Sequence, residues 1–381
     1  MKKFLDCISI VGATPSKFHG TKKYISTGAV ATTEIDESEV VEVTYEDRPS
    51  RANLSAEAGD ILFAKMQGTR KTLLLDSEAE KNIYSTGFYA VRANPEVITT
   101  ECLYYLIDSE LFLAQKDKNC SGATQKAITN GGMAKIEISV PPLSEQGILV
   151  DKLKHLTQLI ADKKKQLNLF DEIIKSRFIE MFGDPKLNPR KWDMVTIGDI
   201  ATDVRYGTSR PATEGGKYPY LRMNNLTYEG HLDLTDLKHI DIPDNEIEKC
   251  VVRNGDVLFN RTNSVELVGK TCVYNLDSDM IIAGYIIRVR IDDRVLPVIL
   301  SSYLNSTVMK EQLRSMAKGA VNQANINAQE LRSISIYLPP ITLQHEFATF
   351  VEQVDKSKFE IQQSLEKLEI LKKSLMQQYF G

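Results

Sequence analysis

The feature that most constrains the fold is an internal duplication that accounts for most of the chain. The segment Gly59-Asp60-Ile61-Leu62-Phe63 returns as Gly255-Asp256-Val257-Leu258-Phe259, an offset of 196 residues. Val140-Pro141-Pro142-Leu143-Ser144 returns as Leu338-Pro339-Pro340-Ile341-Thr342, and Met181-Phe182-Gly183 returns as Tyr379-Phe380-Gly381, both at an offset of 198 residues. Solenoid repeats have periods of roughly 20–50 residues, so this unit is too long to be one of them. The sequence therefore predicts two whole domains of the same fold, each followed by the same kind of tail.

Bulk composition restricts the class of protein. A length of 381 residues suits two domains of roughly 150 residues, and 42% apolar with 26% charged residues is typical of a globular protein. No apolar run approaches the roughly 18–20 residues that cross a membrane. The five cysteines include no Cys-x-x-Cys pair, which argues against a disulfide framework or a zinc ribbon and favours the cytoplasm.

The net charge of −4 is neutral evidence about nucleic acid, because binding needs only a local basic face. Acidic residues are concentrated in Glu34–Glu46 and Asp233–Glu248, which leaves basic stretches around Lys65–Lys71 and Arg205–Arg222.

Each half also has short apolar runs separated by turn residues, a pattern that predicts β-strands. Helices are expected in each half, near Glu101–Lys116 and Pro297–Met316.

After each Pro-Pro pair, a long proline-free stretch has the heptad spacing of a coiled coil. Ser144 and Thr342 are the expected N-caps, and a helix of roughly 39 residues would be about 58 Å long. Alone it would be marginal, so we expect the two helices to pair, antiparallel if a pseudo-twofold axis relates the halves. The alternative is two independent amphipathic helices, each lying on its own domain. Lys163 and Lys358 interrupt the seam, whose predicted members are Leu149, Leu153, Leu156, Ile160, Leu167, Phe170, Ile174, Phe347, Val351, Val354, Ile361, Leu365, Leu368 and Leu375.

The predicted fold class is therefore α+β, with two β-rich domains related by a pseudo-twofold axis and separated by two long antiparallel coiled-coil helices. The predicted boundaries are residues 1–142 for the first domain, 143–183 for the first long helix, 184–340 for the second domain and 341–381 for the second long helix.

The usual catalytic motifs are missing from the sequence. Gly269-Lys270-Thr271 resembles the end of a phosphate-binding loop, but Ser264 occupies the position of the required upstream glycine. The five histidines are scattered, and no His-Glu-x-x-His, Gly-x-Ser-x-Gly or Gly-x-Gly-x-x-Gly motif occurs. We therefore expect a chain that is not an enzyme and that holds no metal.

Three polar segments recur in the same order in each half. One precedes the Gly-Asp strand, one follows it directly, and one lies further downstream. Their Arg, Lys, Asn and Gln side chains can donate to base edges, and their Ser, Thr and Lys side chains suit phosphates. Taken alone, each could also be an ordinary polar turn after a buried strand. The predicted DNA-binding residues are Lys22, Lys23, Tyr24, Ser26, Lys65, Gln67, Thr69, Arg70, Lys71, Gln125, Lys126, Arg205, Arg210, Tyr220, Arg222, Asn224, Asn225, Asn260, Arg261, Thr262, Asn263, Asn322 and Gln323.

The whole chain resembles the specificity subunit of type I restriction–modification systems. The resemblance rests on the two Gly-Asp strands, on Asn260-Arg261-Thr262, and on Pro-Pro-Leu-Ser-Glu-Gln at the start of the first long helix. The helix exit is the most specific part, with Met181-Phe182-Gly183-Asp184-Pro185 followed by Asn188-Pro189-Arg190-Lys191-Trp192. One departure is that the first domain begins almost at Met1.

This resemblance implies that the two β-rich domains are target recognition domains, each reading one half of a split double-stranded DNA site. The helix pair would set the spacer and dock the partners. Two modification subunits carrying S-adenosylmethionine and restriction subunits using ATP and Mg²⁺ are the implied partners, with no cofactor in this subunit. Two alternatives remain open: the specificity subunit of a related type II system, and a duplicated β-rich adaptor that binds no DNA.

Overall fold

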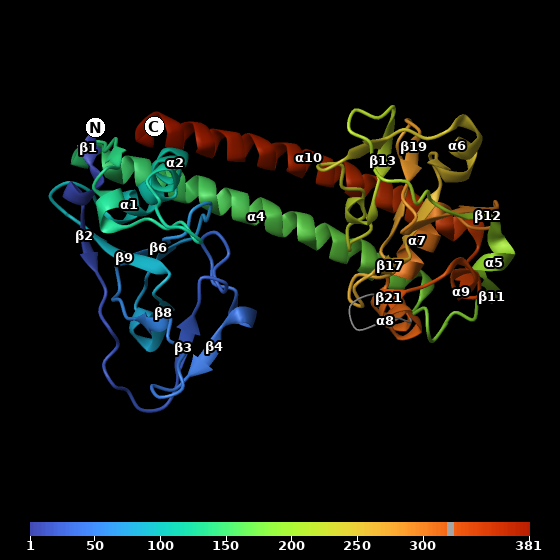
Figure 1. The fold of residues 1–381 in the computed structure, drawn as a ribbon. Helices are drawn as coiled ribbons and strands as arrows, with labels where there is room; N and C mark the ends of the chain where they lie inside the picture. The colour runs from blue at the N-terminus through green and yellow to red at the C-terminus, as the bar shows by residue number, and fades with distance from the viewer. Residues whose placement is uncertain (318–323) are drawn as a thin grey trace. The chain divides into compact units, whose positions relative to one another are not determined.

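The computed structural model describes residues 1–317 and 324–381, which form two compact units (Figure 1). Unit 1 consists of Met1–Lys164 together with Gln363–Gly381, and unit 2 consists of Lys165–Gln362. Each unit is an α+β domain that combines two four-stranded sheets with segments of both long helices.

Unit 1 contains one sheet of order β2-β9-β6-β7 and a second of order β4-β3-β8-β5, in which β3 and β8 are parallel. Unit 1 also contains a short antiparallel pair, β1 with β10. The strands are β1 (Lys2–Lys3), β2 (Ile8–Val11), β3 (Lys22–Ile25), β4 (Val41–Val43), β5 (Ala52–Leu54), β6 (Ile61–Ala64), β7 (Thr72–Leu74), β8 (Asn82–Ser85), β9 (Phe88–Ala93) and β10 (Glu137–Ile138).

Unit 2 repeats this topology strand for strand. Its sheets have the orders β12-β20-β16-β18 and β14-β13-β19-β15, again with one parallel pair, β13 with β19. The pair β11–β22 corresponds to β1–β10, and β17–β21 is an additional short pair. The strands are β11 (Asp193–Thr196), β12 (Ala201–Tyr206), β13 (Tyr218–Leu221), β14 (Lys238–Ile240), β15 (Val251–Val252), β16 (Val257–Asn260), β17 (Thr262–Asn263), β18 (Thr271–Val273), β19 (Met280–Ile282), β20 (Ile286–Ile291), β21 (Ala324–Asn325) and β22 (Ser335–Leu338).

The repeated Gly-Asp motif starts an interior strand in each unit. Gly59 and Gly255 have φ angles of +84° and +90°, a left-handed conformation that glycine adopts without a steric penalty. The strands that follow, β6 and β16, are buried along their whole length and lie between two neighbours. The motif is therefore a turn into the core of each domain.

Helices occupy the expected segment in each half, and in each half a break divides that segment into two helices. Ser109 and Ser306 interrupt the segment because their side chains accept hydrogen bonds from the backbone NH groups of Phe112 and Met309 and start a new helix. The shorter helices are α1 (Thr100–Ile107), α2 (Glu110–Lys118), α3 (Asn130–Met133), α5 (Ile197–Ile200), α6 (Asp244–Cys250), α7 (Pro297–Asn305), α8 (Thr307–Met316) and α9 (Ala328–Arg332), with 3-10 turns η1 (Phe4–Asp6), η2 (Glu37–Glu39), η3 (Ala79–Lys81) and η4 (Met223–Asn225).

The two long helices, α4 (Leu143–Phe182) and α10 (Ile341–Phe380), have 40 residues each, about 60 Å at 1.5 Å per residue. They begin directly after the Pro-Pro pairs, so Ser144 and Thr342 lie in the first turn and are not N-caps. Proline is suited to this boundary because its missing NH is one that the helix leaves unpaired anyway.

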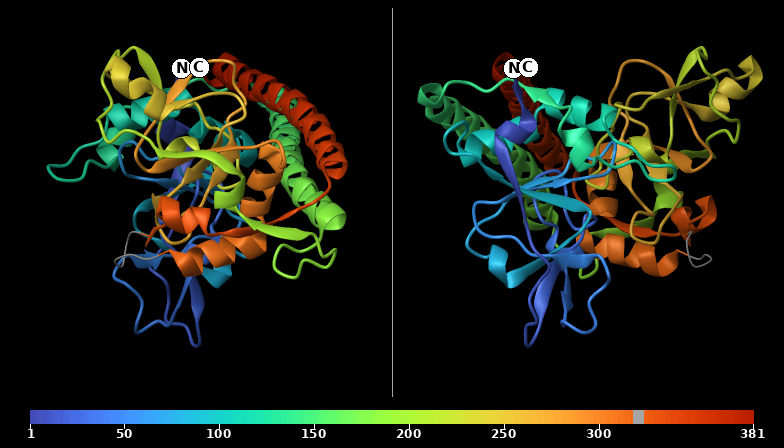
Figure 2. Two further views of the ribbon diagram at one scale, coloured as in Figure 1. Left: turned by 90° about the vertical axis from the view of Figure 1, so that its right-hand side faces the viewer. Right: turned by 60° about the vertical axis from the view of Figure 1, so that its left-hand side comes forward.

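The helices pair in antiparallel fashion within each unit. In unit 1 the first part of α4 lies beside the last part of α10, where both chain ends are also found (Figures 1 and 2), and Lys164 Nζ lies 3.0 Å from Glu369 Oε1. In unit 2 the last part of α4 meets the first part of α10, and Lys358 Nζ lies 2.6 Å from Asp171 Oδ1. A pseudo-twofold axis between the units stays a prediction.

Every predicted seam residue is buried or half-buried. Leu149 and Leu153 of α4 join the core of unit 1, where Met376 and Phe380 of α10 meet them. In unit 2 the corresponding core contains Phe178 and Phe182 of α4 with Phe347 of α10. The helices therefore pack on each other and on the domains, which explains why their apolar stripes are imperfect.

Candidate nucleic-acid interface

In unit 1 the three polar segments identified in the sequence converge around the loop that follows β6. Gln67 N donates to Lys126 O at 2.9 Å, which joins this loop to the downstream segment. Lys71 Nζ donates to Thr27 O at 2.5 Å, which joins it to the upstream segment. Lys116 of α2 holds the loop by donating from its Nζ to Met66 O and Thr69 O. The arrangement places exposed polar side chains of all three segments on one loop cluster.

Unit 2 has the same convergence around the loop that follows β16. Thr262 pairs with Asn325 of β21 through the backbone, and their side chains are hydrogen-bonded at 2.8 Å, so the loop joins the strand that follows the downstream segment. Lys270 Nζ donates to Met223 O at 2.8 Å and joins the upstream segment. Lys71 and Lys270 occupy equivalent positions, since each directly precedes the threonine that pairs with the phenylalanine of the Gly-Asp strand. The scaffold of the cluster is therefore duplicated.

One basic side chain at equivalent positions differs between the clusters. Lys65 N donates to Gly87 O, and Arg261 N donates to Tyr285 O, so the two residues correspond. Lys65 Nζ lies 4.4 Å from the ring centroid of Tyr89, and the Arg261 guanidinium lies 4.9 Å from that of Tyr206. Each cation is thus held over an aromatic face, an attractive arrangement that limits its motion. Burial also lowers the pKa of Lys65.

The aspartate of each Gly-Asp motif has a structural role. Asp60 Oδ1 accepts from Arg92 Nε at 2.7 Å, and Asp256 Oδ1 accepts from Arg290 Nε at 2.8 Å. The second oxygen of each carboxylate accepts a backbone NH three residues upstream. The aspartate of the motif therefore joins its strand to the neighbouring strand and to the preceding turn, and it has a structural role rather than a ligand-binding one.

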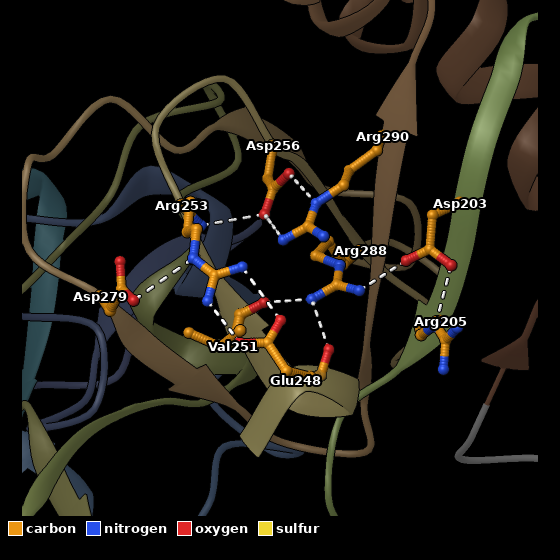
Figure 3. A network of polar contacts seen from close by, with 9 residues as sticks. All are labelled: Asp203, Arg205, Glu248, Val251, Arg253, Asp256, Asp279, Arg288 and Arg290. Atoms are coloured by element: carbon orange, nitrogen blue, oxygen red, sulfur yellow. Dashed lines mark hydrogen bonds and ion pairs between the residues drawn. The ribbon is translucent and has the colours of Figure 1, made fainter. Parts of the chain in front are cut away.

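Unit 2 adds a buried arginine to this brace (Figure 3). Arg288 has only 1% of its side chain exposed and pairs with Asp203 at 2.5 Å, while its other terminal nitrogen donates to Val251 O. Because Val251 lies in the second sheet, the side chain links the two sheets of the unit. Ala90 stands at the equivalent place in unit 1, opposite Leu62 as Arg288 is opposite Leu258. The link that Arg288 makes between the sheets is therefore specific to unit 2.

The structure corrects the prediction for some of the candidate DNA-binding residues. Asn260 is fully buried, and its Nδ2 donates to Thr262 O and Tyr285 O, so it shapes the loop from inside. The candidates whose side chains are enclosed by the protein are Tyr24, Tyr220, Asn225, Asn260 and Thr262. These side chains stabilise the loops from inside, whereas the sequence had suggested that they would be exposed on the loop surface.

The remaining candidates are at least partly accessible. Those exposed are Lys23, Gln67, Arg70, Gln125, Lys126, Arg205, Arg210 and Asn224, and those half-buried are Lys22, Ser26, Lys65, Thr69, Lys71, Arg222, Arg261 and Asn263. Asn322 and Gln323 lie outside the described residues.

Several of the accessible cations pair with carboxylates, which the sequence did not suggest. Arg70 contacts Asp108 at 3.0 Å, and this hydrogen bond raises the pKa of the arginine. The other pairs of this kind are Lys23–Glu37, Arg205–Asp203, Arg210–Glu246 and Arg222–Asp236. The Asp108 carboxylate is buried, whereas ion pairs in which both partners are exposed, such as Lys23–Glu37, are worth little, about 0–1 kcal/mol, so an incoming phosphate can compete for those cations.

Sequence reasoning missed the residues that hold the loops in place. Tyr89, Tyr206, Lys116 and Lys310 were not singled out, although the last two are lysines on otherwise apolar helix faces, which is a detectable signal. Among residues 1–317 and 324–381, no cluster of His, Cys, Asp and Glu could hold a metal ion, and no helix is long and apolar enough to cross a membrane.

The geometry by itself defines a class: a duplicated recognition protein whose two domains share a scaffold, differ in the side chains they present, and carry a long antiparallel helix pair. Comparison with known proteins gives the family. The family model described as the type I restriction modification DNA specificity domain matches twice, at residues 10–169 and 189–372. The chain therefore belongs to this family, whose contribution to restriction–modification is DNA recognition and not catalysis.

Curated relatives agree with this assignment. The chain is similar to the EcoKI specificity subunit of Escherichia coli K12, with 24% identity over 316 residues that cover 77% of this chain and 67% of the relative. It is also similar to the StySPI specificity subunit of Salmonella potsdam, with 23% identity over 345 residues that cover 84% and 74% of the two chains.

Solved structures share the fold. A chain from a structure that describes complex assembly and conformational transition of a type I system matches with a TM-score of 0.57 and 22% identity, covering 98% of this chain and 97% of that one. The specificity subunit of a type I system from M. genitalium matches with a TM-score of 0.55 and 12% identity, covering 100% and 95%.

Proposed function

We propose that this chain selects the target sequence of a type I restriction–modification complex, with unit 1 and unit 2 each reading one half of a split double-stranded DNA site. The observation that carries the proposal is the duplicated loop cluster. In both units the loop after the Gly-Asp strand makes equivalent contacts, through a lysine side chain upstream and through the backbone downstream, while the side chains at equivalent positions differ, as at Lys65 and Arg261.

The chemistry of these loops suits DNA. Arginine donates in pairs to the O6 and N7 atoms of guanine, while lysine, glutamine and serine side chains suit base edges or phosphate oxygens. A guanidinium held over a tyrosine ring, as Arg261 is over Tyr206, loses little conformational freedom when it binds. The two clusters therefore favour two different short sequences.

We further propose that the helix pair binds the other subunits. Apolar side chains project into solvent from α4 and α10, among them Ile148, Phe359 and Ile370, which are 62%, 63% and 68% exposed. Exposed apolar side chains on helices favour protein partners. Two modification subunits would supply S-adenosylmethionine and methylate adenine, and restriction subunits would supply ATP- and Mg²⁺-dependent activity, so this chain itself needs no cofactor.

The test is to map methylated sites in cells that express this chain with its modification subunits. We expect one split site with a nonspecific spacer. Arg261→Ala should relax one base position in one half-site, costing about 1–3 kcal/mol of discrimination there. Lys65→Ala is the matched variant of unit 1, and it should affect only the other half-site.

Two results would count against the proposal. An uninterrupted target would contradict the assignment of one half-site to each unit. If both variants weakened binding equally for every sequence, Arg261 and Lys65 would be phosphate contacts, and the affinity of each variant would fall less steeply with salt than that of the parent chain.

A further inference from the structure

Unit 2 contains a cavity of about 700 Å³ that lies away from the loop cluster. Parts of α4, α10 and α7 and the loop around His231 surround it. Apolar side chains from all of these elements line it, including Leu167, Phe178, Leu232, Val298 and Val351. Its volume is within the range of small-molecule sites, which are mostly apolar with a few polar groups.

Three polar side chains that contact one another line one wall of the cavity. Asp171 Oδ1 of α4 accepts from Lys358 Nζ of α10 at 2.6 Å and lies 2.8 Å from His231 Nε2. These contacts lower the pKa of Asp171 despite the opposing effect of burial. Asp355 of α10 lines the same cavity. The site thus combines an apolar body with two carboxylates, and Lys358 and His231 hold that of Asp171 in place.

The duplication identifies the residues that stand at these positions in unit 1. Thr99 N donates to Gln146 Oε1 and Leu296 N donates to Gln344 Oε1, both at 2.8 Å, so α1 and α7 correspond residue by residue. Tyr104 and Tyr105 of α1 therefore correspond to Ser301 and Ser302 of α7, both of which line the cavity.

The two tyrosines fill space in unit 1 that the two serines leave open in unit 2. Their rings lie 5.3 Å apart, and Tyr105 is 6% exposed. Burial raises the pKa of Tyr105, and a side-chain hydrogen bond with Thr157 of α4 opposes that rise. Counting from Gln146 and Gln344, Thr157 corresponds to Asp355. In unit 1 the phenol group of Tyr105 therefore lies between α1 and Thr157. Unit 2 has no phenol group at the equivalent position, between α7 and Asp355.

We propose that the cavity of unit 2 binds a small phenol, with its ring between α7 and the helix pair and its hydroxyl donating to Asp355. Such a ligand occupies the place that the Tyr105 side chain fills in unit 1. The binding does not depend on the DNA-reading role, because the cavity shares no residue with the loop cluster of β16.

The test is titration of the full-length chain with p-cresol, followed by calorimetry and by the shift in melting temperature. We expect saturable binding at one site, and weaker binding of toluene, which has no hydroxyl. Ser302→Tyr, which restores the side chain of unit 1, should reduce the affinity for p-cresol at least tenfold. Ser176→Tyr is the matched control, because Ser176 is exposed on α4 and does not line the cavity.

A second variant keeps the test decisive if Ser302→Tyr does not fold. Asp355→Leu changes a solvent-accessible position of α10 and removes the proposed acceptor, so p-cresol should lose its advantage over toluene. Absence of saturable binding to the unmodified chain would overturn the proposal. So would binding that neither Ser302→Tyr nor Asp355→Leu alters.

Discussion

Lys310 is a buried lysine that holds the recognition loop of unit 2. Its Nζ donates to Gly269 O at 2.8 Å and lies 5.1 Å from the ring centroid of Tyr228. Burial lowers its pKa to about 7, and the positive charges of Lys270 and Arg314 add to this effect. Removing an ammonium group from water costs free energy. Lys310 therefore lowers the stability of the folded state while its hydrogen bond fixes the position of the loop.

This pKa predicts a dependence of stability on pH. The unfolded lysine has a pKa of about 10.4, so between about pH 7 and pH 10 the unfolded state binds more protons than the folded state. The free energy of unfolding should therefore rise with pH in this window, by up to about 1.4 kcal/mol per pH unit from this group. Urea denaturation of the parent chain and of Lys310→Met at pH 7, 8 and 9 measures the effect.

Lys310→Met removes the titrating group, so the parent chain should gain stability relative to this variant as the pH rises. Lys249→Met is the control, because Lys249 is exposed on α6 and should leave the pH dependence unchanged. A difference between parent and Lys310→Met that is constant from pH 7 to pH 9 would show that Lys310 is fully charged in the folded state.

At the scale of elements, each long helix is fastened to its domain by a buried glutamine in its first turns. Gln146 Nε2 donates to Val97 O and Pro141 O, and Gln344 Nε2 donates to Arg294 O and Pro339 O. Both side chains are fully buried. Each glutamine satisfies one backbone group just before its long helix and two in the loop that leads into α1 or α7, which fixes the direction of the long helix relative to its domain.

Loss of this side chain should destabilise one unit at a time. Gln344→Ala leaves Leu296 N and two carbonyl groups without their partner, and an unsatisfied buried polar group costs about 1–3 kcal/mol. We expect a loss of that order in unit 2, measured as faster amide hydrogen exchange in α7 and the first turns of α10. Gln353→Ala, on an exposed face of α10, is the control and should change little. Equal acceleration in α1 would contradict a local fastening.

The elements that sequence analysis predicted well are those with local signals. The heptad spacing indicated both long helices, and the repeated Gly-Asp motif indicated a buried strand in each half. The breaks at Ser109 and Ser306 were missed, because the capping preference of serine was weaker evidence than the continuous apolar pattern around it.

At the scale of the whole molecule, the duplication itself was readable from the sequence, but the partners of charged residues were not. Lys358 was interpreted as an interruption of the helix seam, whereas it contacts Asp171 and His231, which are 187 and 127 residues away in sequence. Contacts over such separations depend on the completed fold. For the same reason the sequence did not separate Asn260, which is buried, from Arg261, which is half-exposed and next to it.

The place where each long helix passes from one unit to the other gives a test of the spacing role. In α4 this passage falls between Lys164 and Lys165, and in α10 between Gln362 and Gln363. One helical turn inserted within Lys163–Gln166 adds about 6 Å to α4, close to the rise of two base pairs, at about 3.4 Å each. We expect methylation mapping to show a changed spacer with both half-sites unaltered.

An insertion in α4 alone also shifts the register of the helix pair, because four residues are not a whole heptad. A second variant with a matching turn between Gln362 and Gln363 restores equal lengths, so it should methylate more efficiently than the single insertion and keep the longer spacer. If both variants methylated sites with the original spacer, the helices would serve as docking surfaces alone. Changed half-sites would instead mean that the insertion had disturbed the domains, since a spacer that the helices set is independent of the bases that the loops read.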